Sequence, residues 1–348
     1  MSPTCHLFAH NNRPTRFRVT VEHNMAKLHS VNRAVLPLRA DLAIAGTHCA
    51  FATNSEDILS AVAPWRCSPK EPSSRTFEMN VLLDPSMPCE RDVKTQTHFR
   101  GLHHMVIVAI GNHEVFAFDL FRRQVTAAVS RASAVDQDLW NAHWLPITVG
   151  VMGTTVGVVP LHSACVSRNG KGLLIAGASG AGKSTLSVAL AQRDFSHISD
   201  DWTYISREAG ILVAHGINAP VKLLPDAVRH FPELSVRTPK MWFNGELAFE
   251  IEHEAFCRED RGRTTQPQWL VFLERSSSPG CDFSRSTSAV AHEFFEGSAE
   301  RFPDQLPDAS ALRSEMIRSI SNCACWRLRT GESPQVTAEA ISKFCEAN

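Results

Sequence analysis

The stretch Leu173–Ser206, LLIAGASGAGKSTLSVALAQRDFSHISDDWTYIS, brings together a glycine-rich loop, a lysine, two hydroxyl residues and two adjacent aspartates. The apolar residues 173–176 predict a strand before the loop, and residues 186–190 predict a helix after it. A glycine-rich loop between a buried strand and a helix is the setting in which backbone N–H groups can surround a phosphate. The stretch therefore predicts an α/β fold with a phosphate-binding loop.

The loop matches the pattern GxxxxGK[ST] through Gly177, Gly182, Lys183 and Ser184. Its glycines let consecutive N–H groups turn toward phosphate oxygens, and the following helix adds its positive end. We expect Lys183 to place its charge at the β- and γ-phosphates of ATP, and Ser184 to bind Mg²⁺. A turn without a ligand would need neither residue. The residues expected to contact ATP are Gly177, Ser179, Gly180, Ala181, Gly182, Lys183, Ser184 and Thr185.

Two adjacent carboxylates, Asp200 and Asp201, follow the short run 195–199, which we expect to be the next strand. Side chains alternate in direction along a strand, so both can reach one site only if the backbone bends there. One carboxylate can hold Mg²⁺, directly or through water, and the other can accept a proton from an attacking hydroxyl. A solvated acidic turn is the alternative interpretation of the pair.

The segment from Leu161 to Tyr204 resembles the catalytic core of the HPr kinase/phosphorylase superfamily, in particular the HPr-kinase-related proteins that include kinases of ribosomal peptide precursors. Weaker similarity continues through NAPVKLLPDA (218–227), WLVFLE (269–274) and CWRLRTGESPQVTAEAISKF (325–344). The glycine loop and the paired aspartates are also similar to those of ATP-dependent phosphoenolpyruvate carboxykinase. The resemblance implies an α/β P-loop kinase core of this type with a mixed sheet, and the residues before it predict a small α+β domain.

The resemblance also implies roles for individual residues. Lys183 corresponds to the loop lysine and Ser184 to the hydroxyl that binds Mg²⁺. Asp200 would be the base that activates the acceptor hydroxyl and Asp201 the metal carboxylate, although the two roles can also be exchanged. His162, just before the core, corresponds to a histidine that supports the reaction centre.

The chain departs from HPr kinase/phosphorylase after the aspartates. That enzyme carries a glycine-rich signature of the type EIRGLGIIDV, whereas this sequence has only EIEHEAF (250–256). HPr as the substrate, and a reverse phosphorylase reaction, are therefore disfavoured. Glu254 and Glu274 are candidates for a further metal carboxylate. Arg261 and Arg263 could bring a positive charge to the transferred phosphoryl group, or they could belong to a solvated charged loop.

These features favour an ATP- and Mg²⁺-dependent kinase that acts on a hydroxyl, most simply a Ser or Thr of a small protein or peptide. A kinase of a small-molecule hydroxyl is the nearest alternative. An ATPase or nucleotide-dependent switch is a second alternative, disfavoured because a switch needs only one metal carboxylate. The sequence has no LSGGQ-like motif, which disfavours a transport ATPase. No decarboxylation site is recognisable around the core, which disfavours phosphoenolpyruvate carboxykinase.

Changes in composition and hydrophobic pattern divide the chain into three parts. We expect a poorly ordered tail over residues 1–36, a small α+β domain over 37–135 with an antiparallel meander, and the catalytic domain over 136–348. His103, His104 and His113 lie in the small domain without supporting cysteines or carboxylates at metal-site spacing. We therefore expect surface or strand histidines there.

Composition narrows the possible partners. With 348 residues and a formal net charge of -1, the protein has no overall attraction to nucleic acid or to an anionic membrane. Its longest apolar runs are too short to span a bilayer, and its start does not resemble a signal peptide. The ten cysteines are scattered, which favours a reduced cytoplasmic protein. Relatives in the resembled family often assemble, so a homo-oligomer is plausible.

Overall fold

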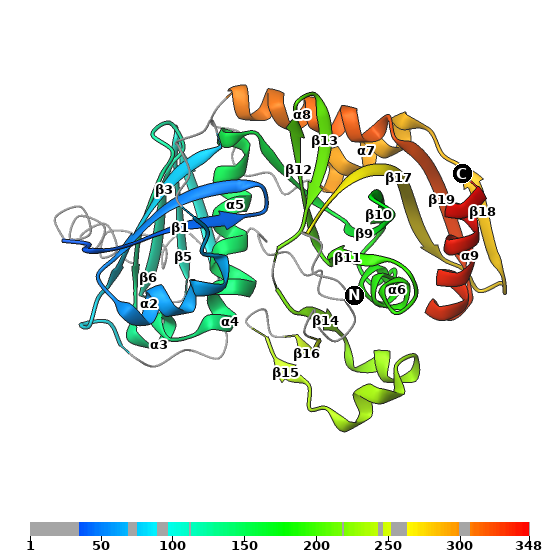
Figure 1. Cartoon of the computed structure of the whole chain (residues 1–348), viewed down its shortest axis with the longest axis horizontal. Coiled ribbons are helices and arrows are strands. Elements are labelled where there is room, and N and C mark those ends of the chain that lie inside the picture. Colours follow the sequence, from blue (N-terminus) through cyan, green and yellow to red (C-terminus); the bar gives the residue numbers. More distant parts are fainter. Residues whose placement is uncertain are drawn as a thin grey trace. The chain divides into compact units, whose positions relative to one another are not determined.

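The computed structural model describes residues 35–68, 75–88, 97–110, 113–217, 219–242, 246–251, 263–298 and 307–347. It is a mixed α/β protein with two compact units (Figure 1). The first unit extends to Val158, and the second begins at Val159 and holds most of the later chain. The expected tail lies outside the described residues except for residues 35 and 36. No helix in the described ranges is long and apolar enough to cross a membrane.

The first unit is built on a mixed sheet with the strand order β1-β2-β3-β7-β6-β5-β4. Strands β2, β3 and β7 pair in parallel, and the other neighbours pair antiparallel. The predicted antiparallel meander is formed by β5, β6 and β7. The strands are β1 (Leu38–Ile44), β2 (Thr47–Thr53), β3 (Thr76–Leu83), β4 (Thr97–Leu102), β5 (Met105–Ile110), β6 (Glu114–Asp119) and β7 (Gln124–Val129).

Two tryptophans attach the helices after β7 to this sheet. Trp144 stacks on Phe116 of β6 with ring centroids 4.3 Å apart, and Trp140 meets Phe51 of β2 edge-on at 6.3 Å. Residues 136–158 therefore belong to the first unit, whereas we expected them in the catalytic domain. The helices of this unit are α2 (Glu56–Ala61), η1 (Ala63–Trp65), α3 (Arg131–Ala134), α4 (Gln137–Leu139), the π-helix η2 (Trp140–Trp144), α5 (Leu145–Met152) and η3 (Gly153–Val156).

The described histidines of the first unit include the sequence candidates His103, His104 and His113. His103 and His104 lie exposed in the turn between β4 and β5, and His104 Nε2 is 3.9 Å from Asp119 Oδ1. Within the described ranges, no three His, Cys, Asp or Glu side chains are arranged to hold a metal ion.

The second unit has a larger mixed sheet in which β10, β17 and β19 run parallel. Antiparallel strands flank them in the order β11-β9-β10-β17-β13-β12-β8, and β18 pairs with β19. The strands are β8 (Val158–His162), β9 (Ala164–Arg168), β10 (Lys171–Ala176), β11 (Ser196–Ser199), β12 (Trp202–Glu208), β13 (Ile211–His215), β17 (Thr264–Arg275), β18 (Cys281–Arg285) and β19 (Ala324–Thr330).

The long strand β17 shows how helices cover both faces of this sheet. Val271 and Leu273 share a buried core with residues of α6 (Lys183–Ala191) and α9 (Pro334–Ala347). Phe272 points to the other face, where its ring meets Phe294 of α7 (Ser288–Ser298) with centroids 5.2 Å apart. The alternation of a buried strand thus fixes α6 and the loop before it on one face. A further helix, α8 (Pro307–Ser321), precedes β19.

A small sheet of β14 (Val221–Leu223), β16 (Leu247–Ile251) and β15 (Lys240–Met241) lies beside α6. Two short 3₁₀ helices, η4 (Pro225–Arg229) and η5 (Pro232–Val236), connect β14 to β15. The run PDAVRHF (225–231) forms η4 and the turn after it.

Candidate active site

The glycine loop, defined here as residues 177–182, joins the end of β10 to the start of α6. The predicted order of strand, loop and helix is present. A Cβ at position 177 would lie 2.7 Å from the Leu273 carbonyl oxygen, so only glycine allows the loop to leave the sheet here. Gly182 has φ +96° and directly precedes the helix. Ala178, Ser179 and Gly180 are exposed, which leaves the loop backbone open to a ligand.

Lys183 opens α6, and its side chain folds back over the glycine loop. Its Nζ donates hydrogen bonds to the carbonyl oxygens of Gly177, at 3.0 Å, and Ala178, at 3.4 Å. Burial lowers the pKa of Lys183, while the nearby Asp201 and Asp200 carboxylates raise it. Both aspartates therefore act electrostatically on Lys183, although they follow a different strand.

Asp200 lies directly after β11, with one oxygen held and the other buried. Its Oδ2 accepts a hydrogen bond from the Lys222 backbone N–H at 3.3 Å. The Ser184 hydroxyl lies beside the carboxylate and lowers its pKa, but Oδ1 has no partner of normal hydrogen-bond geometry among the described residues. Burial, reinforced by the charge of Asp201, outweighs these contacts and raises the pKa of Asp200 to about 6.

Asp201 has a different environment from its neighbour. His162 Nε2 lies 3.0 Å from Asp201 Oδ1, and the imidazole ring stacks on Trp202 with centroids 5.4 Å apart. The Asp201 side chain is 45% exposed. Burial tends to raise its pKa, but His162, Lys183 and Lys222 together hold the pKa below the usual range. Asp201 is therefore an ionised, accessible carboxylate with a fixed partner.

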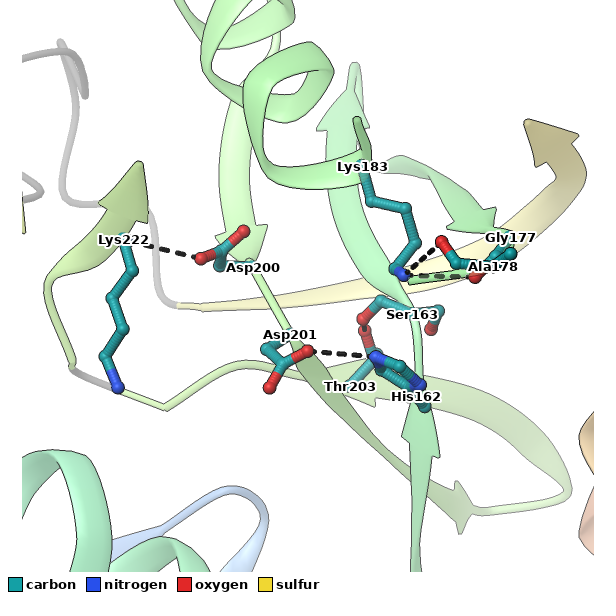
Figure 2. Close-up of polar contacts among 9 residues, drawn as sticks. All are labelled: His162, Ser163, Gly177, Ala178, Lys183, Asp200, Asp201, Thr203 and Lys222. Atoms are coloured by element: carbon teal, nitrogen blue, oxygen red, sulfur yellow. Dashed lines mark hydrogen bonds and ion pairs between the residues drawn. The ribbon is translucent and has the colours of Figure 1, made fainter. Parts of the chain in front are cut away.

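A chain of hydroxyl contacts fixes the turn that carries the two aspartates. Thr203 Oγ1 donates a hydrogen bond to the Ser163 carbonyl oxygen at 2.8 Å, and Ser199 Oγ lies 2.6 Å from Thr203 Oγ1. These bonds tie both ends of the turn to the residue after His162. A backbone bend at Asp200 and Asp201 separates β11 from β12, and Figure 2 shows both carboxylates near Lys183.

Lys222 of β14 closes the site from the small sheet. Its backbone N–H holds Asp200, and its Nζ lies 3.4 Å from the centroid of the Trp242 ring. Figure 2 shows Lys183, Asp200, Asp201 and Lys222 around one region. The arrangement therefore combines two cations and two carboxylates from three separate segments: α6, the turn after β11, and β14.

Two other candidates from the sequence, Glu274 and Arg263, have partners elsewhere. Glu274 Oε1 lies 3.0 Å from Arg327 Nε, so its carboxylate is engaged on β19. Arg263 Nη1 donates a hydrogen bond to the Ile217 carbonyl oxygen at 2.6 Å. Glu254 and Arg261 lie outside the described residues.

The site residues present suit Mg²⁺. Mg²⁺ typically takes one or two carboxylates, a hydroxyl, waters and substrate phosphates rather than a complete protein cage. Ser184 and Asp200 provide a hydroxyl and a carboxylate side by side, and Oδ1 of that carboxylate has no hydrogen-bond partner among the described residues.

Sequence reasoning missed Lys222 and Arg275. Lys222 lies within the run NAPVKLLPDA and Arg275 directly follows WLVFLE, and neither belongs to the glycine-loop or paired-aspartate pattern. Arg275 ends β17, and its guanidinium lies against Gly182, where a Cβ would be 2.5 Å from Nη2. The one available signal was the parallel pairing expected of buried strands, since it brings their carboxyl ends to the same edge.

A scan against protein-family models gave no match, and a search of curated proteins gave none either. Among solved structures, the chain is similar to the HPr(Ser) kinase/phosphatase from Coxiella burnetii, with 11% sequence identity and a TM-score of 0.29. The match covers 54% of this chain and 91% of that chain. A likeness this distant carries no weight in assigning the site.

Proposed function

We propose that this protein is an ATP- and Mg²⁺-dependent phosphotransferase with a core of the HPr-kinase type. It would move the γ-phosphoryl group of ATP to a hydroxyl, most simply a Ser or Thr of a small protein or peptide. A hydroxyl on a small molecule is the alternative acceptor. The resemblance of the segment from Leu161 to Tyr204 to that family supports the proposal, and the arrangement of charges carries it.

The observation that best supports the proposal is that Lys183 and the two carboxylates face one region, yet Lys183 forms no ion pair with either of them. Asp200 and Asp201 both act on the pKa of Lys183. Yet its ammonium is bonded to loop carbonyls, and within the described chain no carboxylate lies within ion-pair distance of it. A structural ion pair would have closed this gap. Cationic and anionic groups held apart in this way suit a triphosphate and its metal ion, which complement both charges.

We assign the metal side of the site to Ser184 and Asp200. The hydroxyl lies beside the Asp200 carboxylate, whose buried Oδ1 has no hydrogen-bond partner among the described residues. Mg²⁺ bound there would neutralise phosphate charge and would itself compensate the carboxylate for its burial. This reverses the roles that the family resemblance implied, because Asp200 and not Asp201 lies beside the loop hydroxyl.

We assign the acceptor side to Asp201 and His162. Asp201 is the more exposed carboxylate, and His162 fixes its orientation. In the reaction, the acceptor oxygen forms a bond to the γ-phosphorus while the bond to the β-phosphate oxygen breaks and ADP leaves. The hydroxyl proton passes to Asp201. A low pKa is acceptable in this base, since the loose transition state of phosphoryl transfer requires little proton removal in advance.

The proposal is tested with γ-labelled ATP and two acceptor sets, a library of Ser- and Thr-containing peptides and a panel of sugars and polyols. Wild-type protein should label a member of one set in the presence of Mg²⁺. Lys183→Ala and Asp201→Asn should lose transfer, and Glu274→Gln is the matched control that should keep it. Transfer that survives both active-site substitutions would contradict the site. Phosphate release without acceptor labelling would favour an ATPase.

The division of roles has its own measurement. Asp200→Asn should raise the Mg²⁺ concentration needed for half-maximal activity by at least tenfold. Asp201→Asn should lower kcat and leave that concentration within about twofold, because its carboxylate is assigned to the acceptor. The opposite pattern would restore the order implied by the family resemblance.

A further inference from the structure

Arg275 lies at the edge of the sheet where the glycine loop begins. It is the last residue of β17, which pairs in parallel with β10, and the loop leaves from the end of β10. Along β17, Val271 and Leu273 face α6, so the alternation of the strand places Arg275 on the α6 side. Topology alone therefore brings this arginine to the loop.

The guanidinium of Arg275 rests directly on the last residue of the loop. A Cβ at position 182 would lie 2.5 Å from Nη2, 3.2 Å from Cζ and 3.5 Å from Nε. Gly182 also has φ +96°, which favours glycine by itself. The glycine thus both permits the turn into α6 and leaves space for a planar cation beside it.

Arg275 forms no ion pair within the described part of the chain, because no carboxylate there lies within ion-pair distance of its guanidinium. The adjacent Glu274 is already engaged by Arg327 at 3.0 Å and by Arg329 at 3.7 Å. Arg275 acts on His230, whose pKa is lowered by burial and then by Arg229 and Arg275.

Arg229 lies beside the same histidine but, unlike Arg275, has a carboxylate partner. Its Nη2 is 3.0 Å from Asp226 Oδ2, so its charge is balanced. Arg275 is therefore a guanidinium that packs on the glycine loop, offers several N–H donors and has no anionic partner among the described residues. Arginine in such a position is suited to bidentate contact with phosphate oxygens.

We propose that Arg275 is a nucleotide-binding residue that contacts the phosphate chain of ATP where it passes Gly182. The inference rests on the proposed function and adds a residue from β17 to a site otherwise built from the glycine loop, the β11 turn, β8 and β14. Lys183 would hold one side of the phosphate chain and Arg275 would hold another. Arg275 is assigned to binding, and no role in proton transfer is required of it.

The test is isothermal titration of ATP, ADP and adenosine in the presence of Mg²⁺ and without an acceptor. Arg275→Ala should weaken ATP and ADP binding by about 10- to 100-fold, the range of a charge-assisted contact, and leave adenosine binding unchanged. Arg275→Lys should recover only part of the loss. Arg329→Ala removes a charge from the neighbouring strand end and should bind like wild type.

Three results would overturn the inference. The first is wild-type ATP affinity in Arg275→Ala, which would leave the proposed function standing and remove only the arginine. The second is an equal loss of ATP and adenosine binding, which would indicate a structural role. The third is a wild-type chain that binds no ATP, in which case the proposed function fails together with the inference.

Discussion

His162 Nε2 and Asp201 Oδ1 lie 3.0 Å apart, joining the end of β8 to the turn after β11. The imidazole has Trp202 stacked against it, so both its position and its plane are fixed. Such a pair can set the direction of the carboxylate without neutralising it.

Removal of this imidazole should affect the rate more than nucleotide binding. We expect His162→Ala to lower kcat by about 100-fold, within the range of general acid–base contributions, and to change the KM for ATP by less than about threefold. His162→Gln, which retains a donor for Asp201, should recover part of the rate. Steady-state kinetics with the identified acceptor decide the question, and an unchanged kcat in His162→Ala would remove the histidine from the site.

The raised pKa of Asp200 predicts that this residue reduces stability near neutral pH. The folded chain holds the proton up to about pH 6, whereas the ordinary value is 3.8. Because the folded state binds the proton more tightly, the free energy of unfolding falls as the pH rises from about 4 through 6. Without Mg²⁺, Asp200→Asn should therefore be more stable than wild type by roughly 1–3 kcal/mol at pH 7.5 and nearly equal to it at pH 4.

Urea denaturation at the two pH values measures this difference. Asp226→Asn is the control, since that carboxylate is exposed and should give no comparable gain. An Asp200→Asn protein that is less stable than wild type at pH 7.5 would show that the ionised carboxylate is satisfied in the fold.

Lys183 should matter for nucleotide binding and little for the empty fold. Its ammonium is bonded to the Gly177 and Ala178 carbonyl oxygens but is also partly desolvated, so the two contributions oppose each other. We expect Lys183→Met to weaken ATP binding at least tenfold while the free energy of unfolding stays within about 1 kcal/mol. Titration calorimetry and denaturation measure the two effects. Lys171→Met, at the other end of β10, should preserve ATP binding.

Glycine should be required at position 216, because Gly216 contacts β11, the strand that directly precedes Asp200. A Cβ at position 216 would lie 1.6 Å from the Ile198 carbonyl oxygen, two residues before Asp200. Gly216→Ala should cost roughly 3 kcal/mol or more, since backbone must move on one side or the other. Gly297, in α7, has no neighbour within 4 Å of such a Cβ, and Gly297→Ala should be neutral or slightly stabilising. Equal melting temperatures for the two variants would contradict this packing.

The local parts of the site were predictable from the sequence, because each is encoded within a few residues. The apolar run 173–176, the glycine loop and the helix after it form as expected, and so does the strand before Asp200. Hydrophobic pattern and glycine placement decide these elements locally. The residues brought from other strands were not predictable in this way, since Arg275 and Lys222 reach the site only through sheet pairing.

The boundary between the two units shows the same limit. Residues 136–158 look continuous with the core in the sequence, but Trp140 and Trp144 pack on the first sheet. Which sheet a helix covers depends on the shape of both surfaces, and one-dimensional periodicity does not contain that information. The π-helix Trp140–Trp144 carries both tryptophan rings, and the local composition does not predict a π-helix there.

The parallel pairing of β10 with β17 also governs when the site can exist. During synthesis, the glycine loop and both aspartates leave the ribosome well before residues 264–275, yet the Leu273 carbonyl that abuts Gly177 and the guanidinium that abuts Gly182 both come from that later strand. Contacts this distant in sequence form late, because the long intervening chain must first be ordered. A nascent chain therefore carries the complete motif without its support, and the proposed nucleotide binding would mark finished folding.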